Sequence, residues 1–224
     1  MKSKISHAVL NVRSRKEKAR AIAQVLDSYR DIRNCRIPDI ATGSGVIASE
    51  IGKMGANVYS VDIRDERIVK KNFIFKKTKD EKLPFKDGEF DIVISNHVMA
   101  HVRDMDMHLK ETRRVLKEDG IVYLSMLNRL AIIEPNFRLP LLSWLPRKIA
   151  GFYVLMFGRG KYYDVNPLTY GKFIGKLRAY FEHEDVTIRL IRKKVSMPAS
   201  SYEILKFFSP VWVFVLTKKP KSQI

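Results

Sequence analysis

The residues best suited to chemistry lie between positions 39 and 62. Gly43 and Gly45 form a tight turn after a short apolar run that ends at Asp39, and Asp62 ends the next apolar run. Glycine permits positive φ and leaves no Cβ in the path of a ligand. A helix beginning at Val46 would point unpaired N–H groups at the turn, and an acid at position 62 can accept both hydroxyls of a ribose. The stretch therefore predicts a strand–turn–helix–strand unit that binds a nucleotide cofactor.

The same stretch is compatible with two classes of cofactor. Residues 43–48, Gly-Ser-Gly-Val-Ile-Ala, satisfy the dinucleotide fingerprint G-x-G-x-x-G/A with an acid about 20 residues further on, which favours an NAD(P)-dependent oxidoreductase. Asp39 favours the other class, because a dinucleotide-binding strand normally carries an apolar residue there. A carboxylate suits S-adenosylmethionine, whose ammonium and sulfonium groups are positively charged.

Three motifs in order resemble one family. Residues 39–45, D-I-A-T-G-S-G, resemble motif I of the class I S-adenosylmethionine-dependent methyltransferases, usually D-x-G-x-G-x-G, with Ala41 replacing the first glycine. Residues 83–93, L-P-F-x-D-x-x-F-D-x-V, resemble the methyltransferase type 11 group. The stretch 96–102, N-H-V-M-A-H-V, is similar to that family's loop after the fourth strand. The chain of matches covers residues 36–127.

The resemblance implies a Rossmann-like α/β fold with a seven-stranded, mostly parallel sheet, helices on both faces and an antiparallel last strand. It also implies S-adenosylmethionine as cofactor and a set of contacts to it. Those cofactor-binding residues are Asp39, Ala41, Thr42, Gly43, Gly45, Asp62, Ile63, Asp80, Glu81, Asn96 and His97. Lys79 holds the usual aspartate position before L-P-F, so the contact with the adenine amino group is assigned to Asp80.

Two histidines are candidate catalytic bases. His97 and His101 follow the fourth strand, and a histidine with an unperturbed pKa near 6.5 can accept the proton of a hydroxyl acceptor. For His101, a structural contact or a contact with the cofactor carboxylate is an equal alternative. The pair could ligate a metal on a helix, but no HExxH pattern accompanies it and no metal is expected. His7, His108 and His183 are expected at the surface.

Composition limits the possible partners. Among 224 residues, 42 Lys and Arg against 24 Asp and Glu give a net charge of +18, which predicts attraction to nucleic acid, anionic lipid headgroups or phosphorylated substrates. This length predicts a single domain over 1–224. The one cysteine, Cys35, excludes an intramolecular disulfide, and with no signal-peptide pattern a cytoplasmic location is expected.

The periodicity of apolar residues predicts the elements. An N-terminal helical segment covers 1–34, with its helix over 15–29, and further helices are expected over 63–71, 105–116 and 167–181. After the strands that flank the glycine turn, strands are expected over 72–75, up to 96, over 121–126, 186–191 and 211–217, and Gly120 is expected to end the preceding helix.

Residues 128–165 break this alternation with prolines and aromatic residues and are expected to form an insertion. One interpretation is a substrate lid on the cofactor pocket. The other is an interfacial amphipathic segment over 139–157, peripheral to a membrane. A spanning helix is not expected, because Pro140, Pro146, Arg147 and Lys148 interrupt the apolar stretch.

The sequence thus predicts a methyltransferase acting on oxygen, with nitrogen as second choice, of a small-molecule, lipid or glycan acceptor. RNA methylation is the alternative that the +18 charge favours. An NAD(P)-dependent oxidoreductase and a catalytically silent binding subunit remain further alternatives. Methylation at carbon-5 of a pyrimidine is excluded, because it needs a cysteine nucleophile and Cys35 precedes the first strand.

Overall fold

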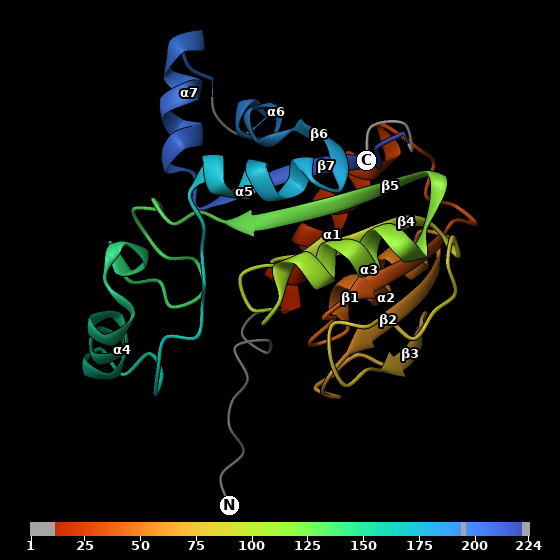
Figure 1. Cartoon of the computed structure of the whole chain (residues 1–224), viewed down its shortest axis with the longest axis horizontal. Coiled ribbons are helices and arrows are strands. Elements are labelled where there is room, and N and C mark those ends of the chain that lie inside the picture. The colour runs from red at the N-terminus through yellow and green to blue at the C-terminus, as the bar shows by residue number, and fades with distance from the viewer. Residues whose placement is uncertain (1–11, 194–195, 221–224) are drawn as a thin grey trace, which may run out of the picture. The chain divides into compact units, whose positions relative to one another are not determined.

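The computed structural model describes residues 12–193 and 196–220, in which helices and strands alternate (Figure 1). The strands are β1 (Arg36–Ile40), β2 (Asn57–Asp62), β3 (Ile74–Lys77), β4 (Phe90–Asn96), β5 (Leu116–Leu127), β6 (Phe181–Asp185) and β7 (Val211–Lys218). The helices are α1 (Val12–Asp27), α2 (Val46–Lys53), α3 (Met105–Val115), the 3₁₀ turn η2 (Leu142–Trp144), α4 (Arg147–Met156), α5 (Tyr170–Arg178), α6 (Thr187–Arg192) and α7 (Ala199–Phe208). Residues 1–11 of the expected N-terminal segment, with His7, lie outside the described residues.

The strands form one seven-stranded sheet in the order β3-β2-β1-β4-β5-β7-β6. β1 runs parallel to β2 and β4, and β2 runs parallel to β3, whereas β6 and β7 are antiparallel. In the register of the central pair, Asp39 lies opposite Ile94. This mostly parallel sheet with a reversed β7 confirms the predicted fold class.

The order of the strands fixes the faces on which the helices lie. The chain moves from β1 outward to β2 through α2, and in the opposite direction from β4 to β5 through α3. Both are parallel crossovers, which are right-handed in almost all proteins, so α2 and α3 must lie on opposite faces. Open α/β sheets bind ligands at the carboxyl ends of the strands where the strand order reverses, which in this sheet is between β1 and β4.

The described residues divide into two compact units, residues 12–96 with 104–123, and residues 97–103 with 124–220. The first unit contains β1–β4 and buries Phe90, Ile37 and Ile92 completely. The second contains β6 and β7, and its largest fully buried side chains include Trp212 and Phe214. The single domain expected over 1–224 stays a prediction.

The last strands differ from the prediction. Residues 186–191 were expected as a strand, but Thr187–Arg192 is the helix α6, and the strand β6 precedes it. The physical reason is Asp185, whose carboxylate accepts a hydrogen bond from the Thr187 N–H at 2.9 Å. This bond satisfies one of the donors left unpaired at a helix start, so the helix begins there.

Three expectations in the first unit also differ. Residues 63–71 form bends and irregular chain in place of a helix, and β3 begins at Ile74, two residues later than expected. α3 ends at Val115 and β5 begins at the next residue, so Gly120 lies within the strand. A Cβ on Gly120 would lie 2.6 Å from Leu116 Cδ1 and 3.0 Å from the Asp91 oxygen. Close approach, not helix termination, therefore requires this glycine.

The insertion expected over 128–165 contains η2 and α4, joined by irregular chain. Within residues 12–193 and 196–220, no helix combines the length and the apolar character needed to cross a bilayer.

Candidate functional site

Asp39 lies near the carboxyl end of β1 with only 3% of its surface exposed. The Thr42 hydroxyl donates a hydrogen bond to Asp39 Oδ2 at 2.7 Å. Burial raises the pKa of Asp39 to about 7, and the negative charge of Asp62 adds to this rise. The hydrogen bond from Thr42 and the positive charge of Arg15 both act in the opposite direction. A carboxylate buried in this way has lost its hydrating water, so a cation bound beside it stabilises its ionised form.

The turn after β1 consists of residues in the left-handed conformation. Ala41, Gly43 and Gly45 have φ values of +55°, +53° and +75°. Ala41 therefore adopts a conformation that costs a side chain free energy, where the family motif has glycine. The Gly45 position has no room for a side chain, because a Cβ would lie 2.3 Å from the Val69 oxygen. At Gly45 the missing side chain thus makes room for this chain's own backbone.

Asp62 ends β2 and connects two backbone segments. Its Oδ2 accepts the Gly43 N–H at 2.9 Å, and its Oδ1 accepts the Arg64 N–H at 3.1 Å. Each carboxylate oxygen retains capacity for a further hydrogen bond, such as one from a hydroxyl. Ile63, the next residue, is 53% exposed although apolar. A half-buried acid beside an exposed apolar side chain is a surface suited to a ribose and its flat base.

The helix α2 begins directly after this turn. Its N-cap residue is Gly45, and no side chain caps its first N–H groups. The Gly45 N–H donates a hydrogen bond to the backbone carbonyl oxygen of Thr42 at 3.2 Å, which closes the turn. The positive end of the helix dipole thus points at the turn, as the sequence predicted.

Asp80 and Glu81 lie in the loop after β3. The Thr78 N–H donates a hydrogen bond to the backbone carbonyl oxygen of Asp62 at 3.0 Å, which connects the start of this loop to the end of β2. Asp80 is exposed and its Oδ1 accepts the Lys82 N–H at 2.9 Å. Glu81 is half-buried, and its charge acts on the imidazole of His108. The loop is therefore tied to Asp62, as the assignment of a base contact to Asp80 requires.

His108 is not at the surface, contrary to the expectation. It is 2% exposed, and its Nε2 lies 3.0 Å from the Ser95 hydroxyl, near the end of β4. Burial lowers its pKa to about 4, against the opposing charge of Glu81. A neutral imidazole here is a structural element that fixes β4 to α3. Half-buried Asn96 is the last residue of β4 and lies in the first unit, whereas His97 belongs to the second unit.

Sequence reasoning missed two cations on α1. Arg15 and Lys18 are half-buried, although the basic side of this helix was interpreted as a solvated surface. Burial lowers the pKa of Arg15, and the negative charge of Asp39 acts against this decrease. Burial and the positive charge of Arg15 together lower the pKa of Lys18 to about 8. A signal was present: positions 15 and 18 extend the buried stripe of Ala19 and Ile22 by one helical turn.

The two candidate bases lie in the second unit. The His97 N–H donates to the Ser125 hydroxyl at 2.9 Å, and His97 has a φ of +62°, which is rare for a side chain of this size. His101 is exposed, and its Nε2 lies 3.4 Å from Asn136 Nδ2 of the insertion. The insertion therefore reaches the predicted catalytic loop. Within residues 12–193 and 196–220, no three His, Cys, Asp or Glu side chains form a metal-binding group.

The insertion also contains a buried acid that sequence reasoning missed. Glu134 is 1% exposed, its Oε2 accepts the Phe137 N–H at 2.6 Å, and its Oε1 has no hydrogen-bond partner. Burial raises its pKa to about 7, and the charge of Asp164 adds to the rise. The signal in the sequence was that Glu134 is the only acid between residues 128 and 163.

A basic pocket of about 720 Å³ lies elsewhere in the first unit. Its positively charged lining residues are Arg36, Lys76, Lys82, Lys86 and Arg114. Its two acids, Asp87 and Glu89, form ion pairs with Arg114 and Arg36. The three lysines form no ion pair with any carboxylate in the described part of the chain.

The residues around Asp39 fit S-adenosylmethionine. The buried carboxylate at the tip of β1 suits a cation, and the half-buried bases of α1 suit a carboxylate. The amino-acid part of this cofactor carries an ammonium and a carboxylate on one carbon, so one group of each charge is needed to bind it. A nicotinamide dinucleotide carries two phosphates and would meet a buried acid where it needs a neutral contact.

We predict that Gly45→Ala lowers the free energy of unfolding by about 3 kcal/mol, because left-handed strain and overpacking against the Val69 oxygen each cost about 1–3 kcal/mol. Gly88→Ala is the matched control, since Gly88 has a φ of +60° with no atom within 4 Å of the added Cβ. It should cost only about 1 kcal/mol. Urea denaturation measures both, and equal losses would contradict a packing role for Gly45.

Asp39 should make stability fall with rising pH. The carboxyl ionises near 3.8 when unfolded and near 7 when folded, so between these values the folded state binds more protons. The free energy of unfolding then falls by up to about 1.4 kcal/mol per pH unit. Asp39→Asn should remove this contribution in urea titrations from pH 4 to 8. Thr42→Val, which removes the hydrogen bond to the ionised form, should extend the fall to higher pH; parallel profiles of wild type and Asp39→Asn would contradict it.

Comparisons with known proteins agree with this geometry. Residues 38–124 match the Methyltransf_11 family model, described as a methyltransferase domain. A ubiquinone biosynthesis O-methyltransferase of Pelagibacter ubique is 28% identical over 137 residues, which are 55% of this chain and 56% of that protein. The chain thus spans about half the length of that relative.

Solved structures share the fold. The PH0226 protein of Pyrococcus horikoshii has a TM-score of 0.65 at 20% identity, over 96% of this chain and 97% of that one. An S-adenosylmethionine-dependent methyltransferase of Mesorhizobium loti has a TM-score of 0.60 at 15% identity, over 92% and 99%. The resemblance to the class I S-adenosylmethionine-dependent methyltransferases is therefore confirmed, in sequence over residues 38–124 and in fold over most of the chain.

Proposed function

We propose that the protein transfers a methyl group from S-adenosylmethionine to an oxygen of a small, lipid-like acceptor. The observation that carries the proposal is the buried Asp39 carboxylate, which has a hydrogen bond from Thr42 but no ion pair in the described part of the chain. Its environment favours a cationic ligand at the end of β1. The match of residues 38–124 to a methyltransferase domain supports the same conclusion.

The proposal assigns each end of the cofactor to residues of the first unit. Asp39 accepts the ammonium, and Arg15 with Lys18 binds the carboxylate, so the two charges of the amino-acid part meet opposite charges. Asp62 accepts the ribose hydroxyls, while Ile63 covers one side of the adenine ring. Asp80 or Glu81 accepts the adenine amino group. The remaining predicted contacts of the first unit, Ala41, Thr42, Gly43, Gly45 and Asn96, form the backbone wall of the site.

Bound S-adenosylmethionine supplies a methyl group on a sulfonium, which an aligned oxygen can attack. The chain's contribution is then mainly to hold the acceptor in line, since positioning can supply most of the rate. A hydroxyl acceptor loses its proton during transfer. His101 is our first candidate to take that proton, because it is exposed and reaches Asn136 of the insertion; His97 is the second.

The choice of acceptor rests on the relative and on the insertion. The Pelagibacter ubique protein is named for ubiquinone biosynthesis, and quinones of that kind carry a long apolar chain. The insertion here is rich in apolar side chains with few charges. Together they support a hydroxylated ring with an apolar tail, in preference to a glycan. Contact of residues 139–157 with a membrane would bring such an acceptor to the enzyme in a cytoplasmic setting.

RNA methylation is the second candidate function, and the basic pocket favours it. Three lysines without ion pairs line a cavity of about 720 Å³, which could hold a phosphate of the backbone. An RNA substrate would be retained with a steep dependence on salt, since each phosphate contact releases counterions. Retention that persists unchanged from 50 to 500 mM salt, or no retention, would leave the small-molecule proposal in place.

We predict that Asp62→Ala weakens S-adenosylmethionine binding by about 1–3 kcal/mol, because charge-assisted hydrogen bonds to the ribose are lost. Isothermal titration measures the dissociation constant. Asp119→Ala is the control, since Asp119 lies at the start of β5 and pairs with Arg30. Circular dichroism checks that loss of the Gly43 contact leaves the fold intact. An unchanged constant in Asp62→Ala would remove Asp62 from the site.

Methyl transfer is tested with radiolabelled S-adenosylmethionine and a panel of hydroxylated aromatic compounds, with and without prenyl tails. We expect transfer to tailed phenols. His101→Asn should then lower kcat by about 100-fold or more, with cofactor affinity unchanged, because only proton removal is affected. His183→Asn, on the half-buried β6, should retain full activity. Transfer to RNA alone would overturn the acceptor proposal, and an active His101→Asn would exclude this base.

A further inference from the structure

The insertion presents large apolar side chains to solvent in one region of the second unit. Ten such residues, all 44–66% exposed, form what we call the apolar face: Ile132, Ile133, Leu141, Trp144, Ile149, Phe152, Leu155, Met156, Phe157 and Tyr162. Single exposed apolar residues are ordinary on proteins, but such a concentration within about 30 residues marks an interaction site.

The helix α4 contacts its own unit along a narrow line. Only Ala150 and Val154, one helical turn apart, are buried, whereas Ile149, Phe152 and Leu155 are more than half exposed. Figure 1 shows α4 apart from α5, α6 and α7 of the same unit. A helix that turns its larger side chains outward gains little from its own fold. The exposed apolar side of α4 is therefore available to pack against another molecule.

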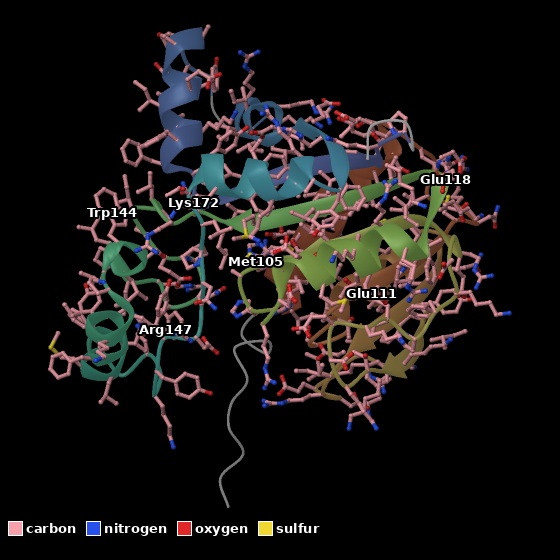
Figure 2. The ribbon with its side chains drawn as sticks, viewed as in Figure 1. Met105, Glu111, Glu118, Trp144, Arg147 and Lys172 are labelled. Atoms are coloured by element: carbon pink, nitrogen blue, oxygen red, sulfur yellow. The ribbon has the colours of Figure 1, made fainter. Side chains whose placement is uncertain are left out.

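The residues before α4 are held in place by hydrogen bonds, so this part of the face is ordered. The Leu141 N–H donates to the Ile132 oxygen at 2.7 Å, and Trp144 Nε1 donates to the Ala131 oxygen at 3.1 Å. These bonds hold the ring of Trp144 on η2, which contacts α4. Figure 2 shows Trp144 and Arg147 on this segment.

The charge around the apolar face is mainly positive, because, of its two nearby acids, Glu134 is buried and only Asp164 is exposed. Between residues 135 and 163 there are five basic residues and no acid. The basic residues are Arg138, Arg147, Lys148, Arg159 and Lys161, of which Arg147 and Lys148 begin α4 and Arg159 and Lys161 follow it. Apolar side chains bordered by cations match the two layers of an anionic membrane surface, acyl chains beneath negatively charged headgroups.

We propose that the apolar face docks on a bilayer that contains anionic lipids, with the side chains of α4 and Trp144 among the acyl chains. Two copies of this chain would bring five cations against five, which opposes pairing through the face. An RNA would leave the apolar side chains uncovered. The inference rests on the proposed function only for its purpose, which is access to an acceptor dissolved in the membrane; docking itself requires no cofactor.

Vesicle flotation tests the proposal with phosphatidylcholine vesicles and with vesicles containing a quarter phosphatidylglycerol. We expect binding to the anionic vesicles that weakens at least fivefold without phosphatidylglycerol or in 0.5 M salt. Phe152→Ser with Leu155→Ser should weaken it at least tenfold. The matched control is Ile204→Ser with Phe207→Ser on α7, where both residues are also more than half exposed. Absence of binding by wild type, or an equal loss in the control, would overturn the proposal.

The charges and Trp144 give two further readouts. Arg147→Glu with Lys148→Glu should abolish the preference for anionic vesicles, whereas Lys172→Glu, on the exposed part of α5, should preserve it. The chain has two tryptophans, and Trp212 is buried. Vesicles should therefore shift the emission of Trp144 to the blue, and Trp144→Phe should lose the shift.

Two outcomes separate this proposal from others. Emission that vesicles leave unchanged would contradict docking through this face. A concentration-dependent dimer that Phe152→Ser with Leu155→Ser dissolves would assign the face to a second copy and overturn the membrane proposal. Isothermal titration with S-adenosylmethionine should give one dissociation constant for wild type and all these variants. Wild-type protein that binds the cofactor but no vesicles thus overturns the docking proposal alone, and wild-type protein that binds vesicles but not the cofactor overturns the proposed function alone.

Discussion

The site depends on a carboxylate that the fold has removed from water. Asp39 reaches the end of β1 with 3% of its surface exposed, and its one described hydrogen bond comes from Thr42. Such a group costs free energy in the empty protein, and this cost is recovered when a cation binds beside it. The same loss of water disfavours the ionised form of Asp39 and raises its pKa to about 7. The selectivity for a positively charged cofactor that we propose would thus follow from the position of Asp39 near the end of β1, more than from the glycines that follow it.

The surrounding structure keeps this carboxylate in position through backbone contacts. Asp62 accepts the N–H of Gly43, so the tip of β2 holds the turn after β1. The absent side chain of Gly45 admits the Val69 oxygen, so the segment after β2 packs on the same turn. The turn is therefore fixed from two sides by elements that also carry Asp62 and Ile63, for which we propose the ribose and base contacts. A binding turn preorganised in this way loses little conformational freedom when a ligand binds.

The sequence predicted the fold class and the strand–turn–helix–strand unit over 36–62 well because both depend on local patterns. The turn at 39–45 and the acid at 62 are set by residue types and spacing, and the strands that flank them are short segments with mostly apolar interiors. Prediction failed where a particular side-chain contact decides. His108 is buried where Ser95 of β4 offers it a partner, and the helix α6 begins where the Asp185 carboxylate accepts the Thr187 N–H. Arg15 and Lys18 were misread because a basic helix face is usually solvated, although their positions continue the buried stripe. Which of the predicted contacts touch the cofactor stays a prediction.

The account is tested most directly by titrating the protein with S-adenosylmethionine and, separately, with NADH in an isothermal calorimeter at pH 8, where Asp39 is ionised. We predict saturable binding of S-adenosylmethionine at one site per chain and no heat from NADH. Binding of NADH in preference to S-adenosylmethionine would contradict the central claim that Asp39 faces a cation.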